Sequence, residues 1–209
     1  MRWSIQILMV TIAMVLVFGT QYGFATPSLE ISTSKQVYEY GDFLSINFQI
    51  SEVTGNDIII HIIDSSNKTS APIDVPVNKT NSTITAPVPL DKTRFSPGTY
   101  YINAEYSGAK ASTSFQVIDS GKIVIPVQFK LLVNTMAPGS PIDQTYAGII
   151  REMINENILN ISNYNNQTNQ IHIPKWFENN VRWWSENLIS DNDFGMATEY
   201  LIQKGIMQV

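Results

Sequence analysis

The spacing of apolar residues changes near residue 120, and this change limits the folds open to the chain. Before it, apolar residues recur at every second position, as at Ile46, Phe48 and Ile50, which is the pattern of a strand with one buried face. After Gly121 they recur every three or four residues, as in an amphipathic helix. The sequence predicts a mainly β N-terminal domain followed by a small all-α C-terminal domain.

Residues 26–119 are predicted to form an antiparallel immunoglobulin-like β-sandwich. Turn residues such as Gly55-Asn56 and Pro97-Gly98 separate short runs of alternating apolar residues, and no helical pattern interrupts them. Residues 58–63 hold five isoleucines interrupted only by His61, which is typical of a central strand buried on both faces.

Three stretches of this part, "YEYGDFLSINFQIS", "IIIHIID" and "SPGTYYINAEYSGAKASTSFQV", resemble the sandwich of macroglobulin-type and microbial surface proteins. In those proteins a Y-x-x-G-[DE] turn opens a strand, and a G-T-Y strand forms a hairpin with a [ST]-x-F-x-V strand. The resemblance implies the fold and says little about function, because such sandwiches carry many unrelated tasks.

The C-terminal part contains an internal repeat with a shift of 48 residues, from Ile125-Pro126 to Ile173-Pro174. We expect each proline at the first position of a helix, where its missing N–H leaves no bond unmade. Two helical hairpins are predicted, over 123–159 and 172–209, joined by a polar linker over 160–171. The apolar stripes of the two first helices are Phe129, Leu132, Val133 and Met136, and Phe177, Val181, Trp184 and Leu188.

Both second helices have start and stop signals. Ser140 with Asp143, and Ser190 with Asp193, each place a hydroxyl three residues before a carboxylate, as in a capping box. We expect the ends to lie near Asn157 and Gly205, whose left-handed backbone conformation favours a chain that folds back.

The second repeat, "IPKWFENNVRWWSENLISDNDFGMATEYLIQKGIM", resembles a module of exported and cell-envelope proteins of ammonia-oxidising archaea. The module reads roughly I-P-x-W, N-N, W-W, I-[SD]-D-x-x-[FY] and Y-L-I-x-x-G-I, and it often stands in tandem or beside immunoglobulin-like domains. The resemblance implies an envelope location and no particular activity. The first repeat departs from the module because it lacks every tryptophan.

Three of the four tryptophans lie in the second repeat. Trp184 falls within the apolar stripe and is predicted to be core, since a large ring helps to fill a small hairpin. Trp176 and Trp183 lie seven residues apart along one edge of that stripe. They either pack against the rest of the protein or form an exposed edge for a sugar or a protein partner.

Residues 1–25 are typical of an export signal. Arg2 precedes an apolar run that ends in Gly23-Phe24-Ala25, a small-x-small cleavage pattern. The alternative is an uncleaved anchor, which would be the membrane attachment of the chain. A secreted or extracytoplasmic envelope location follows from either interpretation.

Composition disfavours several classes of function. Arg2 is the only charge in residues 1–25, so the remainder has 12 Lys and Arg against 18 Asp and Glu, a net charge of −6 that disfavours nucleic acid as a partner. The absence of cysteine excludes disulfides and a blue-copper site. Asp191 and Asp193 could suggest calcium, but the loop lacks the glycine and glutamate of an EF-hand and fits a helix cap. No metal, cofactor or catalytic residue is therefore predicted.

Five N-x-[ST] sequons lie in predicted loops or in the linker, where N-glycosylation of an exported protein is plausible. Their asparagines are Asn67, Asn78, Asn81, Asn160 and Asn166.

These observations favour a non-catalytic secreted or envelope protein, in which the sandwich acts as a spacer or binding domain and the helical repeats contact another envelope or secreted protein. The alternative is an accessory subunit or a sugar- or peptide-binding module that uses Trp176 and Trp183. A third class, a hydrolase with an unfamiliar site, lacks a visible constellation of catalytic side chains.

Overall fold

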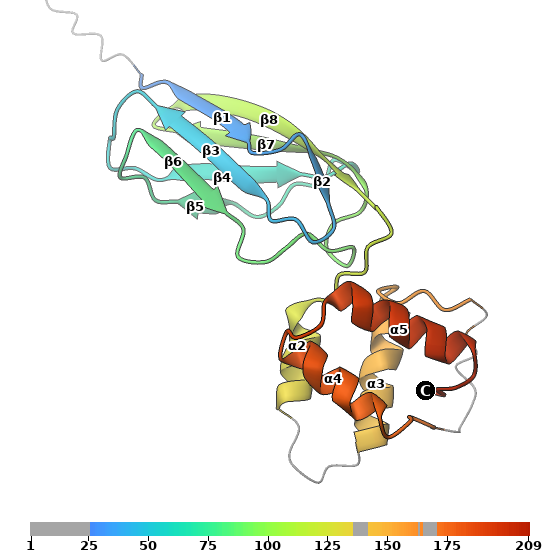
Figure 1. Cartoon of the computed structure of the whole chain (residues 1–209). Helices are drawn as coiled ribbons and strands as arrows, with labels where there is room; N and C mark the ends of the chain where they lie inside the picture. Colours follow the sequence, from blue (N-terminus) through green and yellow to red (C-terminus); the bar gives the residue numbers. More distant parts are fainter. Residues whose placement is uncertain (1–25, 136–141, 163, 165–170) are drawn as a thin grey trace, which may run out of the picture.

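The computed structural model describes residues 26–135, 142–162, 164 and 171–209. In Figure 1 a part built of strands is followed by a part built of helices, and the C-terminus lies on the helical part. We call residues 29–118 the sandwich and residues 127–209 the helical unit. The predicted signal segment lies outside the described residues.

The sandwich consists of two sheets. One sheet has three antiparallel strands in the order β1 (Leu29–Thr33), β3 (Ser45–Ile50) and β6 (Asn81–Thr85). The other has five strands in the order β2 (Val37–Glu39), β8 (Ala109–Ile118), β7 (Gly98–Tyr106), β4 (Ile58–Ile63) and β5 (Ile73–Val75).

The predicted alternation of buried and exposed residues is confirmed in β3 and β7. Ile46, Phe48 and Ile50 of β3 are buried, as are Tyr100 and Ile102 of β7. The side chains that the two sheets turn inward form one hydrophobic cluster, because successive residues of a strand point to opposite faces. The predicted mainly β class of this part is therefore confirmed.

Two details of the predicted sheet are wrong. β2 runs parallel to β8, with Tyr38 opposite Val117, so the sandwich is not antiparallel throughout. The outer face of β4 is not buried, since Ile59 is 40% exposed. Isoleucine on that face reflects the preference of β-branched residues for a pleated surface, which exists with or without a covering layer.

The helical unit contains α2 (Val127–Asn134), α3 (Ile142–Asn155), α4 (Phe177–Ser185) and α5 (Asp191–Gln203). Their buried side chains form a second hydrophobic cluster. α2 packs more extensively against α4, which belongs to the other repeat, than against α3 of its own repeat. The two repeats therefore share one core.

The first helices do not begin at their prolines. Pro126 immediately precedes α2, and α4 begins only at Phe177. The amide nitrogen of Phe177 donates to the carbonyl of Pro174 at 2.8 Å, so a tight turn precedes the helix. The predicted proline position is wrong by one residue in the first repeat and by three in the second.

Three helices end in the same way, with a residue of positive φ followed by an amide that bonds back across the last turn. The φ angles are 56° at Asn157, 59° at Asn187 and 67° at Gly205. After α4, the nitrogen of Leu188 donates to the carbonyl of Trp183 at 2.7 Å. The ends near Asn157 and Gly205 were predicted. Leu188 was predicted to be buried and is 66% exposed, because the helix has ended before it.

The predicted polar linker is partly packed. Tyr164 and Ile171 contact the core of the helical unit, and the Tyr164 hydroxyl donates to the carbonyl of Val209 at 3.0 Å. The backbones of His172 and Gln208 also exchange two hydrogen bonds of 2.9 Å. The start of the second repeat is thus joined to the C-terminal end of the chain.

Residues 123–125 connect the sandwich to the helical unit in an extended conformation. Val124 belongs to the hydrophobic cluster of the sandwich, whereas Ile123 and Ile125 belong to that of the helical unit. Gly195 of α5 leaves room for this segment, since a Cβ atom there would lie 2.7 Å from Cγ2 of Ile123. Successive side chains therefore enter different cores.

Candidate functional site

The three described tryptophans differ in environment. Trp184 has no solvent exposure, whereas Trp176 is 53% and Trp183 is 41% exposed. Trp184 is thus core, as predicted. Trp176 contacts Phe177 edge-on with ring centroids 6.2 Å apart, but neither it nor Trp183 is covered by the first repeat or by the sandwich. The interpretation of these two residues as packed side chains is wrong.

Trp184 is held through its ring face and through its indole nitrogen. It stacks on Phe194 of α5 at a centroid distance of 4.4 Å, and the ammonium of Lys130 lies 5.5 Å from the ring centroid. Its indole nitrogen donates a 2.8 Å hydrogen bond to Oδ1 of Asp191. A buried tryptophan needs such an acceptor, since an unpaired N–H in the core is costly.

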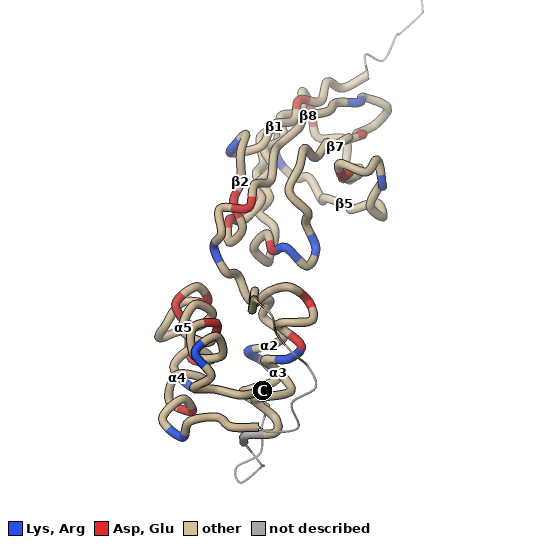
Figure 2. Tube along the Cα trace, turned by 90° about the vertical axis from the view of Figure 1, so that its right-hand side faces the viewer, with Lys and Arg blue, Asp and Glu red and all other residues tan. Residues whose placement is uncertain are grey.

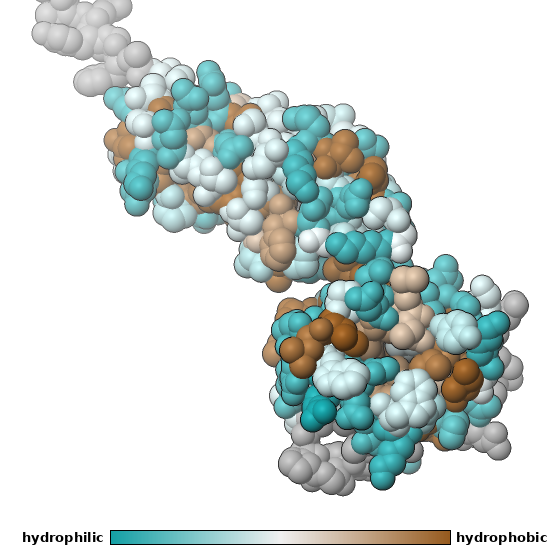
Figure 3. Space-filling view, in the orientation of Figure 1, coloured by the Kyte–Doolittle hydropathy of each residue, from teal (hydrophilic) through white to brown (hydrophobic). Residues whose placement is uncertain are grey.

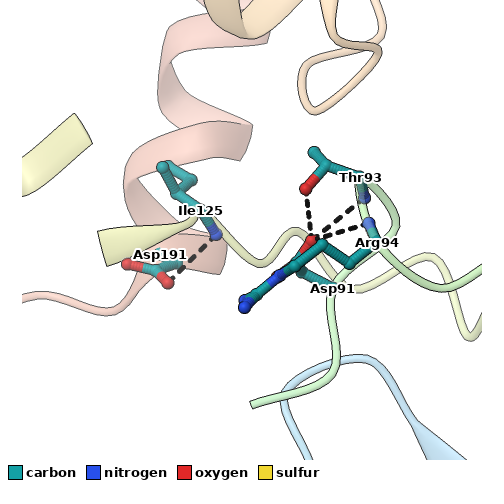
Figure 4. Close-up of polar contacts among 5 residues, drawn as sticks. All are labelled: Asp91, Thr93, Arg94, Ile125 and Asp191. Atoms are coloured by element: carbon teal, nitrogen blue, oxygen red, sulfur yellow. Dashed lines mark hydrogen bonds and ion pairs between the residues drawn. The ribbon is translucent and has the colours of Figure 1, made fainter. Parts of the chain in front are cut away.

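Asp191 is the first residue of α5 and bonds to three separate segments. Figure 4 shows one of these bonds, to the backbone of Ile125. Besides Trp184 of α4, it accepts a 3.1 Å bond from the backbone nitrogen of Ile125 through Oδ2, and it forms a 2.8 Å ion pair with Lys130 of α2. Its neighbour Asn192 accepts from the nitrogen of Ile123 at 3.0 Å. Asp191 and Asn192, at the start of α5, thus bond to the connecting segment, to α2 and to α4.

The cap of α5 has the predicted residues. Ser190 Oγ accepts from the backbone nitrogen of Asp193 at 3.1 Å and donates to the Asp193 carboxylate at 2.7 Å. The equivalent cap of the first repeat was predicted at Ser140 and Asp143. Ser140 and the side chain of Asp143 lie outside the described residues.

Large apolar side chains are exposed over much of the helical unit. They come from α2, from α4 and the residues on either side of it, and from α5 and the residues after it. These side chains are Val127, Leu131, Leu132, Trp176, Trp183, Leu188, Met196, Tyr200 and Ile206. Figure 3 shows apolar and intermediate residues among polar ones on the face of the unit turned to the viewer. Exposed apolar side chains scattered among polar ones are common on protein surfaces, so their number alone does not define an interaction surface.

The two histidines lie in different parts of the structure. His61 lies in β4 with Nδ1 3.3 Å from the carbonyl of Ser70, and His172 is exposed in the segment before α4. Among the described residues, no group of three or more His, Asp or Glu side chains could hold a metal ion. Figure 2 shows charges of both signs interspersed along both parts of the chain.

The asparagines of four sequons are exposed: Asn67, Asn78, Asn81 and Asn160. The predicted loop position is wrong for Asn81, which is the first residue of β6 and pairs with Gln49 of β3. The fifth, Asn166, lies outside the described residues. Asn67 has a φ of 62° and sits in a turn closed by the Asp64 carboxylate. No helix among the described segments has the length and apolar content that a membrane crossing needs.

Comparison with protein-family models found no match, and comparison with curated proteins found none. The chain is similar to a solved structure of trypsin-activated alpha-2-macroglobulin from Escherichia coli, with 16% identity and a TM-score of 0.36 over 44% of this chain and 7% of that one. It is also similar to the PKD domain of an M14-like peptidase from a Thermoplasmatales archaeon, with 11% identity and a TM-score of 0.26 over 43% and 92%. A third similar structure is the Ig7 domain of Dscam1, with 18% identity and a TM-score of 0.29 over 44% and 98%.

Proposed function

We propose that the chain is a non-catalytic binding protein of the cell envelope or the extracellular space, composed of two domains. The sandwich serves as a spacer or binding domain, and the helical unit binds another envelope or secreted protein through Trp176 and Trp183. The observation that carries this proposal is the contrast between neighbours: Trp184 is buried completely, while Trp183 leaves 41% of its surface in water.

Burial of exposed tryptophan rings is a strong source of binding energy. Tryptophan is enriched among the residues that dominate protein interfaces, because its ring is large and rigid. Trp183 projects from a helix that is anchored by Trp184, so the exposed ring is presented from a fixed backbone. A partner could cover it without reordering the helix.

The location rests on the sequence. The apolar segment in residues 1–25 supports export, and the resemblance of the second repeat to a module of archaeal envelope proteins supports the same compartment. The exposure of four sequon asparagines is compatible with glycosylation after export.

The test uses residues 26–209 as bait in envelope extract of the source organism. We expect one or more captured proteins to be lost with the double variant Trp176→Ala and Trp183→Ala. Tyr101→Ala is the matched control, because Tyr101 is an equally exposed aromatic residue on the sandwich. If a protein is still captured by the double variant but is lost with Tyr101→Ala, the binding surface lies on the sandwich instead.

A second candidate function is sugar or peptide binding by the same edge. Trp176 immediately precedes α4 and Trp183 lies within it, so an extended ligand that runs along this helix could contact both rings. Titration of purified protein with glycans, followed by tryptophan fluorescence, distinguishes this candidate from a protein partner.

A further inference from the structure

A cleft lies between the sandwich and the helical unit. It has a volume of about 430 Å³, and its walls come from the loops around Phe43 and Pro89 on one side and from α2 on the other. Figure 3 shows a hollow at this junction, with apolar atoms along its helical border. The volume falls in the range of small-molecule sites, which are often found between two folded units.

The two walls are held together at the base of the cleft. Val124 is buried in the sandwich core, and the backbone nitrogens of Ile123 and Ile125 bond to Asn192 and Asp191 of α5. These attachments involve three consecutive residues, so little free chain remains between the walls. The cleft is therefore a property of the folded chain.

The walls are largely apolar and uncovered. Phe43 on the sandwich is 50% exposed, and Leu131 on α2 is 57% exposed. Val127, one helical turn before Leu131, also lines the cleft and is exposed. An apolar ligand would remove this surface from water, which favours binding.

One wall also presents a positive charge. Asp91 is almost completely buried, with a side-chain exposure of 1%, and its carboxylate accepts bonds from the backbone nitrogens of Thr93 and Arg94 and from the Arg94 guanidinium. Arg94 itself is 45% exposed. The guanidinium bonds to Asp91 through Nε and Nη2, and no bond from Nη1 is found among the described residues.

Arg94 lines the cleft, and Figure 4 shows how its side chain lies. Its guanidinium points from the sandwich loop toward the side on which Asp191 lies. Asp191 is already bonded to Trp184, Ile125 and Lys130. The cleft thus holds two ion pairs, Arg94 with Asp91 and Lys130 with Asp191. Arg94 is the more exposed of the two cations, and its Nη1 is the donor left for a ligand.

We propose that this cleft binds a small organic anion with an apolar body and a single carboxylate. The apolar body would lie between Phe43 and Leu131, and the carboxylate would accept hydrogen bonds from Arg94, since charge-assisted bonds of this kind are among the strongest in proteins. This site is separate from the Trp176 and Trp183 edge and does not depend on the function proposed for that edge.

The probes are octanoate and octanol, which share an apolar chain and differ in charge. In titrations of ¹⁵N-labelled residues 26–209, we expect octanoate to shift the amides of Phe43, Ile125 and Leu131, and to bind about tenfold more tightly than octanol. Equal affinity for the two probes, or octanoate shifts confined to other regions, would overturn the proposal.

Variants test the walls without disturbing the ion pairs. Phe43→Ser and Leu131→Ser are each expected to weaken octanoate binding about tenfold. Since both side chains are half exposed, the thermal transition should be nearly unchanged, which serves as the folding check. Tyr101→Ser and the double variant Trp176→Ala and Trp183→Ala should bind octanoate as the unmodified protein does. Unchanged binding by both wall variants would also refute the site.

Discussion

The indole nitrogen of Trp184 and the carboxylate of Asp191 are 2.8 Å apart, at the point where α4, α5 and the connecting segment meet. The same carboxylate holds Lys130 and the backbone of Ile125. One side chain at the start of a helix therefore joins parts of the chain that lie 66 residues apart.

Replacing Asp191 by alanine should destabilise the helical unit by about 3 kcal/mol, because it leaves a buried indole N–H and a backbone N–H without their acceptor. It also removes the carboxylate partner of the Lys130 ammonium, which keeps its hydrogen bond to Asn187. Urea unfolding followed by tryptophan fluorescence measures this, since every tryptophan of residues 26–209 lies in the helical unit. The control is Ser190→Ala, which removes the cap of the same helix and should cost about 1 kcal/mol. Equal losses for the two variants would contradict the joining role of Asp191.

The tryptophans should differ in their contribution to stability. Trp184→Ala removes a fully buried ring and should cost about 3 to 5 kcal/mol. Trp176→Ala and Trp183→Ala should each cost less than about 1 kcal/mol, because their rings remain half in water. Thermal unfolding of the three variants ranks them, and a large loss for Trp176 or Trp183 would mean that these rings are core after all.

Gly195→Ala should destabilise the helical unit by about 1 to 3 kcal/mol, because the new methyl group meets Ile123 at 2.7 Å. Gly148 in α3 is the matched control, since a Cβ atom there meets nothing within 4 Å. Gly148→Ala should stabilise by about 0.5 to 1 kcal/mol through helix propensity alone. The double variant Gly195→Ala and Ile123→Val should be more stable than Gly195→Ala alone, because valine is smaller than isoleucine at the point of contact. If the double variant is no more stable, contact with Ile123 is not the cause of the loss.

Alkaline pH should weaken the sandwich through Tyr40. Burial raises the pKa of Tyr40 to about 12, with negative charges nearby acting in the same direction. In the unfolded chain the phenol titrates near pH ~10. The stabilisation is complete below pH ~10 and is lost as the pH rises toward 12, because the unfolded state releases the proton first.

The measurement for Tyr40 is the free energy of unfolding between pH ~9 and pH ~12. Tyr40→Phe should flatten the decline and should lower stability at neutral pH by about 1 kcal/mol, since the carbonyl of Phe95 loses its 2.8 Å hydrogen bond. In this variant the free energy of unfolding should still fall somewhat with rising pH, because burial also raises the pKa values of Tyr100 and Tyr146. A slope identical to that of the unmodified protein would exclude Tyr40 as the source.

The sequence predicted those features that depend on local patterns. The alternation through Ile46, Phe48 and Ile50 identified β3, and the residues able to adopt positive φ identified the ends of α3 and α5. Asn187 ends α4 in the same way and was overlooked, so the apolar spacing was followed past the end of the helix to Leu188.

Features that depend on distant segments were not predictable in this way. The parallel pairing of β2 with β8 joins residues far apart in the chain, and no spacing within either strand encodes it. Asp191 was considered only as a cap or an ion ligand, because its partners Ile125 and Lys130 become neighbours only after α2 has packed against α4. The exposure of Trp183 likewise depended on which helices cover α4.

The division of residues 123–125 between two hydrophobic clusters affects how the molecule carries mechanical load. Tension applied between the N-terminal end of the sandwich and the helical unit passes along this short extended segment. Extracting Val124 on one side opens the core of the sandwich. Extracting Ile123 and Ile125 on the other side opens the core of the helical unit and also breaks the backbone bonds to Asn192 and Asp191. The junction therefore transmits a pulling force from one part to the other directly, because it contains no flexible linker that would first have to be stretched.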